Sequence, residues 1–128
     1  IKFKHDGVCR LVGIDAPEIP RGAKVGQPWA REAMMALEGM MGMGQVTVLV
    51  YGSDKYGRML CAILDAHGYL INLTLLESGL AQTYMLEKSP FADGFLAAEN
   101  RAKKAKMGIW GLPSYESPAD YRQRLKVQ

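Results

Sequence analysis

The stretch "CRLVGIDAPE", from Cys9 to Glu18, carries the strongest indications of both fold and chemistry. It begins as a short apolar strand with one arginine, Arg10, and ends in a turn stiffened by Pro17. Asp15 and Glu18 lie on this turn, where carboxylate oxygens can bind a hard cation or orient and deprotonate a water molecule. The alternative is an ordinary solvated turn with no such role.

Arg10 favours the functional interpretation of this turn. A buried guanidinium needs partners, so packing alone explains this arginine poorly, whereas a guanidinium suits a phosphate oxygen. A second motif, "DKYGR" from Asp54 to Arg58, predicts a tight turn in which Gly57 takes a positive φ angle. Two guanidinium groups beside carboxylates are the set that phosphoryl transfer requires. If the arginines instead lie on the polar faces of their strands, both are ordinary surface residues.

Length and composition limit the protein to a few classes. The chain has 128 residues, of which 48% are hydrophobic and 23% charged, and this suits one globular domain, 1–128. The net charge of +3 permits a nucleic-acid partner without requiring one. No apolar run has the length of a membrane helix, so we expect no membrane partner.

The order of the predicted elements indicates an α+β fold. Strands are expected at 1–4, 8–14, 45–51, 58–64 and 69–71, and helices at 28–41, 72–78 and 89–107. A C-terminal tail follows at 111–128, in which Ser117-Pro118 is expected to start a short helical piece. Asn72 is expected to cap the second helix. The strands follow one another without regular strand–helix alternation, which favours a small antiparallel barrel with helices at one end over a parallel sheet.

Four blocks of the sequence resemble the staphylococcal nuclease-like (thermonuclease) family. They are "RLVGIDAPE" at 10–18, "DKYGR" at 54–58, "INLTLLESGLA" at 71–81 and "AENRAKKAKMGIWG" at 98–111. The resemblance implies a fold that is mainly a β barrel, a five-stranded OB-fold barrel with about three helices. It favours a secreted or cell-envelope location.

The resemblance also implies a calcium-dependent nuclease that hydrolyses phosphodiesters in DNA and/or RNA and leaves 3′-phosphates. Asp15 would bind Ca²⁺ through its carboxylate and Ala16 through its backbone carbonyl, while Glu18 would position or deprotonate the attacking water. Arg10 and Arg58 would hold the phosphate. The residues implied to contact the nucleotide are Lys55, Tyr56 and Tyr84.

One feature of the family is missing. An Asp-Gly-Asp-Thr motif usually precedes the strand that begins here at Ile1, and it supplies a further calcium ligand. The expectation is therefore an N-terminally incomplete domain that lacks the first barrel strand. An upstream segment, a second chain that completes the barrel, or degeneration of the domain would each explain this. The rival function is a non-catalytic OB-fold module that binds nucleic acid or protein and has a degenerate metal site.

The two cysteines, Cys9 and Cys61, lack the spacing of a zinc site. If Arg10 and Arg58 face one site, strand alternation places both cysteines on the opposite, inward face. The family barrel puts their strands side by side, so the thiols are predicted to be buried and close. We expect free thiols rather than a disulfide.

Overall fold

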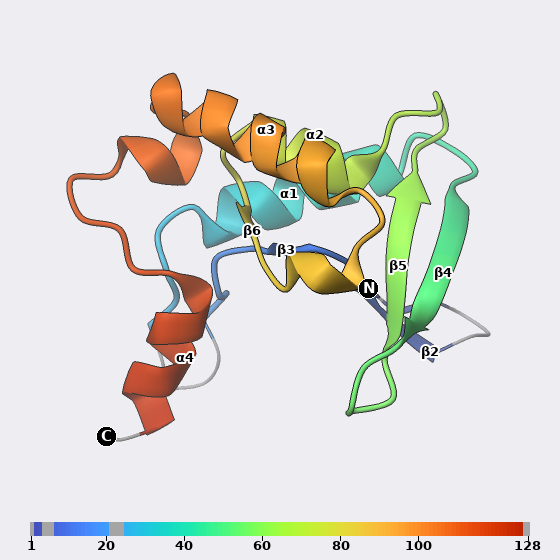
Figure 1. The fold of residues 1–128 in the computed structure, drawn as a ribbon, viewed down its shortest axis with the longest axis horizontal. Coiled ribbons are helices and arrows are strands. Elements are labelled where there is room, and N and C mark those ends of the chain that lie inside the picture. Colours follow the sequence, from blue (N-terminus) through green and yellow to red (C-terminus); the bar gives the residue numbers. More distant parts are fainter. Residues whose placement is uncertain (1, 4–6, 21–24, 127–128) are drawn as a thin grey trace.

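The computed structural model describes residues 2–3, 7–20 and 25–126 and contains two sheets and four α-helices in this part of the chain (Figure 1). The strands are β1 (Lys2–Phe3), β2 (Gly7–Leu11), β3 (Ile14–Asp15), β4 (Thr47–Ser53), β5 (Met59–Leu64) and β6 (Gln82–Thr83). The helices are α1 (Ala30–Met41), α2 (Ile71–Glu77), α3 (Ala92–Lys104) and α4 (Pro118–Lys126), with 3₁₀ turns η1 (Leu86–Lys88) and η2 (Gly108–Gly111). Residues 1 and 4 of the first predicted strand lie outside the described residues.

The main sheet has the strand order β1-β2-β5-β4, and β3 pairs with β6 in a second, two-stranded sheet. The predicted α+β content is confirmed, but the sheet is not closed and the five-stranded barrel is not confirmed. The prediction of purely antiparallel strands is wrong, because β2 and β5 run parallel, with Arg10 opposite Leu60. The chain between them passes through α1 and β4, and this crossover returns β5 in the same direction as β2.

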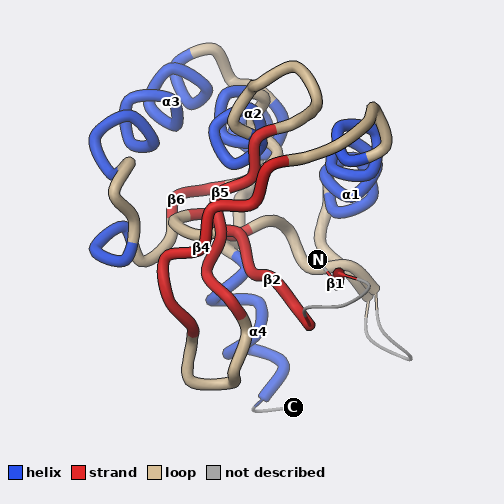
Figure 2. Tube along the Cα trace, turned by 90° about the vertical axis from the view of Figure 1, so that its right-hand side faces the viewer, coloured by secondary structure: helices blue, strands red, loops and turns tan. Residues whose placement is uncertain are grey.

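Helices α1, α2 and α3 lie together at one end of the sheet, and α4 lies apart from them (Figures 1 and 2). Each of the longer helices buries one stripe, as in α3, where Phe95, Ala98 and Ala102 lie at helical spacing and are inaccessible to solvent. The main core cluster consists of Cys9, Ile14, Cys61, Ile63, Ile71, Leu75, Leu76, Ala81, Phe95 and Ala98. Among the described helices, none combines the length and apolar character needed to cross a membrane.

The predicted strand at 8–14 is broken at Gly13 into β2 and β3. Gly13 has φ +78°, and a Cβ atom there would lie 2.9 Å from the ring of Phe95, so glycine suits both the turn and the packing. After this break, Ile14 pairs with Thr83 and Asp15 pairs with Gln82 of β6. The break therefore moves Asp15 onto a different sheet from Arg10.

Asn72 is a bridge between strands, and its predicted role as a helix cap is wrong. Leu70 occupies the N-cap position of α2, and Asn72 lies in the first turn with its side chain fully buried. Its amide nitrogen donates to the carbonyl oxygens of Val12 at 3.0 Å and Cys61 at 3.1 Å, and its amide oxygen accepts from Ile63 N at 3.2 Å. Asn72 thus joins the chain after β2 to the middle of β5 from inside the core.

Cys9 and Cys61 form a disulfide across the same pair of strands, with Cα atoms 6.1 Å apart. Both side chains are buried and adjacent, as the alternation of the strands predicts. The expectation of free thiols is wrong: the parallel register places Cys61 opposite Leu11, close enough to Cys9 for a covalent link.

We predict that Asn72→Ala lowers the free energy of unfolding by about 2–4 kcal/mol, because Val12 O and Ile63 N lose a buried partner. Chemical denaturation measures the change. Thr74→Ala is the control on the same helix, since its hydroxyl donates one turn back, to the carbonyl oxygen of the N-cap residue Leu70. Equal stability of Asn72→Ala and the wild type would contradict the bridging role.

We expect the denatured, unreduced protein to show no reactive thiol groups and the reduced protein to show two, because both cysteines are joined. Reduction should lower the free energy of unfolding by about 2–4 kcal/mol. Thiol titration and denaturation with and without reductant test both statements. Two reactive groups before reduction would restore the expectation of free thiols.

Candidate active site

A cleft of about 430 Å³ lies between β2, the turn after β3 and helix α1. Five of the predicted site residues line it: Arg10, Asp15, Ala16, Glu18 and Arg58. Side chains of α1 and α2 form an apolar part of the lining. The fold therefore brings the two sequence motifs, which are some forty residues apart, to one concave surface.

Asp15 is the most buried charged group of this cleft, with 7% of its side chain exposed. Its Oδ1 lies 3.8 Å from Nη2 of Arg10, the arginine that the sequence singled out. The Arg10 guanidinium also lies over the ring of Tyr84, 5.2 Å from its centroid. These contacts place Arg10, Asp15 and Tyr84 in one group.

Arg122 of helix α4 also lies at these carboxylates, although no sequence motif predicts it. Its Nη2 lies 2.8 Å from Asp15 Oδ2, its Nη1 3.4 Å from Asp15 Oδ1, and Nη1 also donates to Glu18 Oε1. Burial would lower the pKa of Arg122, but hydrogen bonds to Asp15 and Glu18 outweigh it and hold the pKa above its ordinary value. The predicted start of a short helix at Ser117-Pro118 is the only local signal, and it says nothing of this contact.

Arg58 is oriented by Asp54, the first residue of its own motif. The Arg58 Nε donates to Asp54 Oδ2 at 2.7 Å, and the backbone amides of Tyr56 and Arg58 both donate to Asp54 Oδ1 at 2.9 Å. Gly57 has φ +80°, the positive angle predicted for this turn. Asp54 therefore sets both the turn and the direction of the Arg58 side chain.

The remaining predicted residues extend the site along the surface. Tyr56 is 72% exposed, with Arg58 and Lys55 both near its ring, at 5.5 and 5.2 Å from the ring centroid. An exposed aromatic ring flanked by cations can stack against a nucleotide base while the cations meet phosphate.

The carboxylate oxygens of the cleft are suitable as some, but not all, of the ligands of a calcium ion. Asp15 and Glu18 both bind the guanidinium of Arg122, so their oxygens converge on one cationic position, and carboxylates are the ligands that calcium prefers. Calcium takes six to eight oxygens, and no group of three or more His, Cys, Asp or Glu side chains within the described residues could hold a metal ion. Asp15, Glu18 and the Ala16 carbonyl would therefore need water or further ligands to complete the shell.

The fold and the cleft define a small α+β domain in which arginines and carboxylates from separate motifs line one concave surface. The family model described as "Staphylococcal nuclease homologue" matches residues 8–111. The chain belongs to this family.

Several fungal proteins named probable endonuclease LCL3 are similar to this chain. The relative from Verticillium alfalfae is 33% identical over 126 residues, covering 91% of this chain and 44% of the relative. The relative from Komagataella phaffii is 32% identical over 133 residues, covering 98% of this chain and 58% of the relative. The chain thus spans about half the length of these relatives.

We predict that Asp54→Asn accelerates hydrogen exchange at the amides of Tyr56 and Arg58, because a carboxylate accepts their hydrogen bonds more strongly than an amide does. Burial would raise the pKa of Asp54, but hydrogen bonds from Arg58 and Tyr56 outweigh it and hold the pKa below its usual 3.8. The folded pKa is depressed, so the stabilisation is present above pH 3.8 and is lost as the pH falls through the folded value.

Exchange measured by NMR near neutral pH and again below the depressed pKa of folded Asp54 tests this, with Asp93→Asn on α3 as the control. The wild type and Asp54→Asn should differ in the first condition and converge in the second. Equal exchange rates near neutral pH would contradict the role given to Asp54.

Proposed function

We propose that this protein is a nuclease that hydrolyses phosphodiester bonds in DNA and/or RNA. The observation that carries the proposal is the cleft in which Arg10, Asp15, Glu18 and Arg58 meet, drawn from two separate sequence motifs. Membership of the staphylococcal nuclease homologue family and the similarity to proteins named probable endonuclease support the same activity.

In this proposal, Asp15 and the Ala16 carbonyl would hold calcium, which would supply Lewis-acid polarisation of the phosphate. Arg10 and Arg58 bind the non-bridging oxygens and stabilise the charge that they gain in the transition state. Glu18 accepts a proton from water as the water oxygen bonds to phosphorus. The bond from phosphorus to the 5′ oxygen breaks, the 5′ oxygen takes up a proton from solvent, and the phosphate stays on the 3′ oxygen.

The proposal also includes the nucleotide contacts, the barrel and the location that the resemblance to the family implies. Tyr56, Tyr84 and Lys55 would contact the nucleotides next to the scissile phosphate. Tyr84 lies beside Arg10, Tyr56 lies beside Arg58, and Lys55 lies over the Tyr56 ring. The five-stranded OB-fold barrel that the resemblance implies, with a second chain as the partner that completes it, belongs to the same proposal. The disulfide between β2 and β5 supports an oxidising compartment, such as the secreted or cell-envelope location that the resemblance favours.

A second function, a module that binds nucleic acid without cleaving it, is favoured by one observation. Arg122 binds both carboxylates that the nuclease reaction would use. A permanent ion pair at this point would prevent Asp15 from holding a metal and Glu18 from accepting a proton.

We predict calcium-dependent cleavage of plasmid DNA or of RNA that Arg10→Ala and Arg58→Ala each slow by roughly a hundredfold or more, because both guanidiniums act on charge that develops in the transition state. Arg101→Ala is the control, since Arg101 is an exposed arginine of α3 that does not line the cleft, and it should cleave near the wild-type rate.

Gel assays with calcium and with chelator measure the rates, and filter binding measures affinity on the same samples. If nucleic acid binds but no calcium concentration produces cleavage, the binding module replaces the nuclease. If all three arginine variants cleave equally fast, Arg10 and Arg58 have no part in the reaction.

A further inference from the structure

The carboxylates proposed to serve the metal and the water are bound by a side chain of the same protein. The Arg122 guanidinium contacts both oxygens of Asp15 and one oxygen of Glu18, using two of its nitrogens. Asp15 is only 7% exposed, and the exposed fractions of Glu18 and Arg122 are 24% and 35%. Forked guanidinium–carboxylate contacts of this kind are among the strongest that side chains form.

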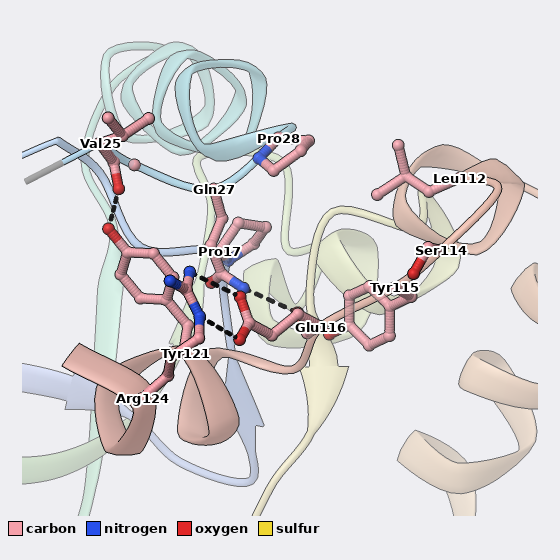
Figure 3. A pocket seen from close by; sticks show the side chains of 11 residues that line it. Pro17, Val25, Gln27, Pro28, Leu112, Ser114, Tyr115, Glu116, Tyr121 and Arg124 are labelled. Carbon is pink, nitrogen blue, oxygen red and sulfur yellow. Dashed lines mark hydrogen bonds and ion pairs between the residues drawn. The ribbon is translucent and has the colours of Figure 1, made fainter. Parts of the chain in front are cut away.

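Helix α4 is held in place by contacts other than this ion pair. Tyr121, 5% exposed, donates its hydroxyl to the carbonyl oxygen of Val25, and Gln27 Nε2 donates to Glu116 O at 2.7 Å (Figure 3). Figure 3 also shows the Arg124 guanidinium paired with the Glu116 carboxylate. Because the helix is docked, the Arg122 side chain is kept at a high effective concentration beside the carboxylates.

A guanidinium and a divalent cation cannot both use the same carboxylate oxygens at bonding distance, because they would also repel each other. We propose that Arg122 is an internal competitor of the divalent cation for Asp15 and Glu18, so that helix α4 lowers the metal affinity of the site. This inference rests on the proposed function, because it concerns the metal that the nuclease reaction would use. The cation binds when the Arg122 side chain swings off the two carboxylates.

The ring of Tyr84 is a second partner for the Arg122 guanidinium when a cation displaces it from the carboxylates. Its central carbon lies 5.8 Å from the ring centroid of Tyr84, and Arg10 lies 5.2 Å from the same centroid. A rotation of the side chain can therefore free the carboxylates while Arg122 keeps a cation–π contact. Release of α4 from the protein is not required, so Tyr121 stays bound to Val25 when metal binds.

Arg122→Gln is predicted to bind Ca²⁺ roughly tenfold more tightly than the wild type, within the usual range for coupling between two sites. Arg124→Gln is the matched control, because Arg124 lies two residues along the same helix and pairs with Glu116 at 2.8 Å. It removes the same charge without freeing Asp15 or Glu18 and should bind calcium like the wild type. Arg122→Lys keeps the charge but loses the fork, so it should lie between Arg122→Gln and the wild type.

Calorimetric titration of each protein with calcium chloride measures these affinities, and Tyr121 hydrogen bonding can be followed by NMR in the same titrations. A merely structural role for Arg122 would weaken calcium binding in Arg122→Gln, the opposite of the predicted change. If Arg122→Gln does not fold, comparing Arg122→Lys with the wild type shows whether loss of the arginine raises or lowers the calcium affinity.

Asp15→Asn separates failure of this inference from failure of the proposed function. If Arg122→Gln and the wild type bind calcium equally while Asp15→Asn does not bind it, competition is overturned and the metal site stands. If neither the wild type nor Arg122→Gln binds calcium, both the competition and the calcium-dependent reaction are overturned.

Discussion

Asn72 donates two hydrogen bonds and accepts one inside the core, and these bonds connect the chain around β2 to β5. The parallel pairing of β2 with β5 depends on this bridge and on the disulfide between Cys9 and Cys61. The same pairing carries Arg10 on one strand and brings Arg58, which precedes the other strand, to the cleft. The core bridge and the candidate site thus lie on opposite faces of one strand pair. The apolar face is buried in the core, and the charged face lines the cleft.

The electrostatic arrangement of the cleft is nearly self-neutral. Asp15 faces Arg10 and Arg122, and Glu18 faces Arg122, so the carboxylate pair is matched by two guanidinium groups. A buried charge without a partner is costly, so moving one member of this set away destabilises the others. The arginines therefore stay bound to the carboxylates when no competing cation is present. A divalent cation and a phosphate together would reverse this pairing, since the cation satisfies the carboxylates and the phosphate satisfies the arginines.

Much of the candidate site was predictable because its parts are close in sequence. Arg10, Asp15 and Glu18 lie within nine residues, and the strand and the proline turn that hold them leave local signals. The turn at 54–58 was predictable in the same way, because Gly57 requires a positive φ angle. Arg122 was not predictable, since it lies 107 residues from Asp15 and nothing in its own helix indicates that contact.

The sequence by itself determined the local elements: the strand that carries Arg10, the carboxylate turn, the amphipathic helices and the inward direction of both cysteines. Hydrophobic periodicity and turn chemistry act over a few residues, so they are readable without the fold. Only the tertiary structure decided the parallel direction of β5, the disulfide, the bridging role of Asn72 and the position of α4. Each of these depends on which distant segments meet after the chain has crossed over, and local patterns carry no information on that geometry.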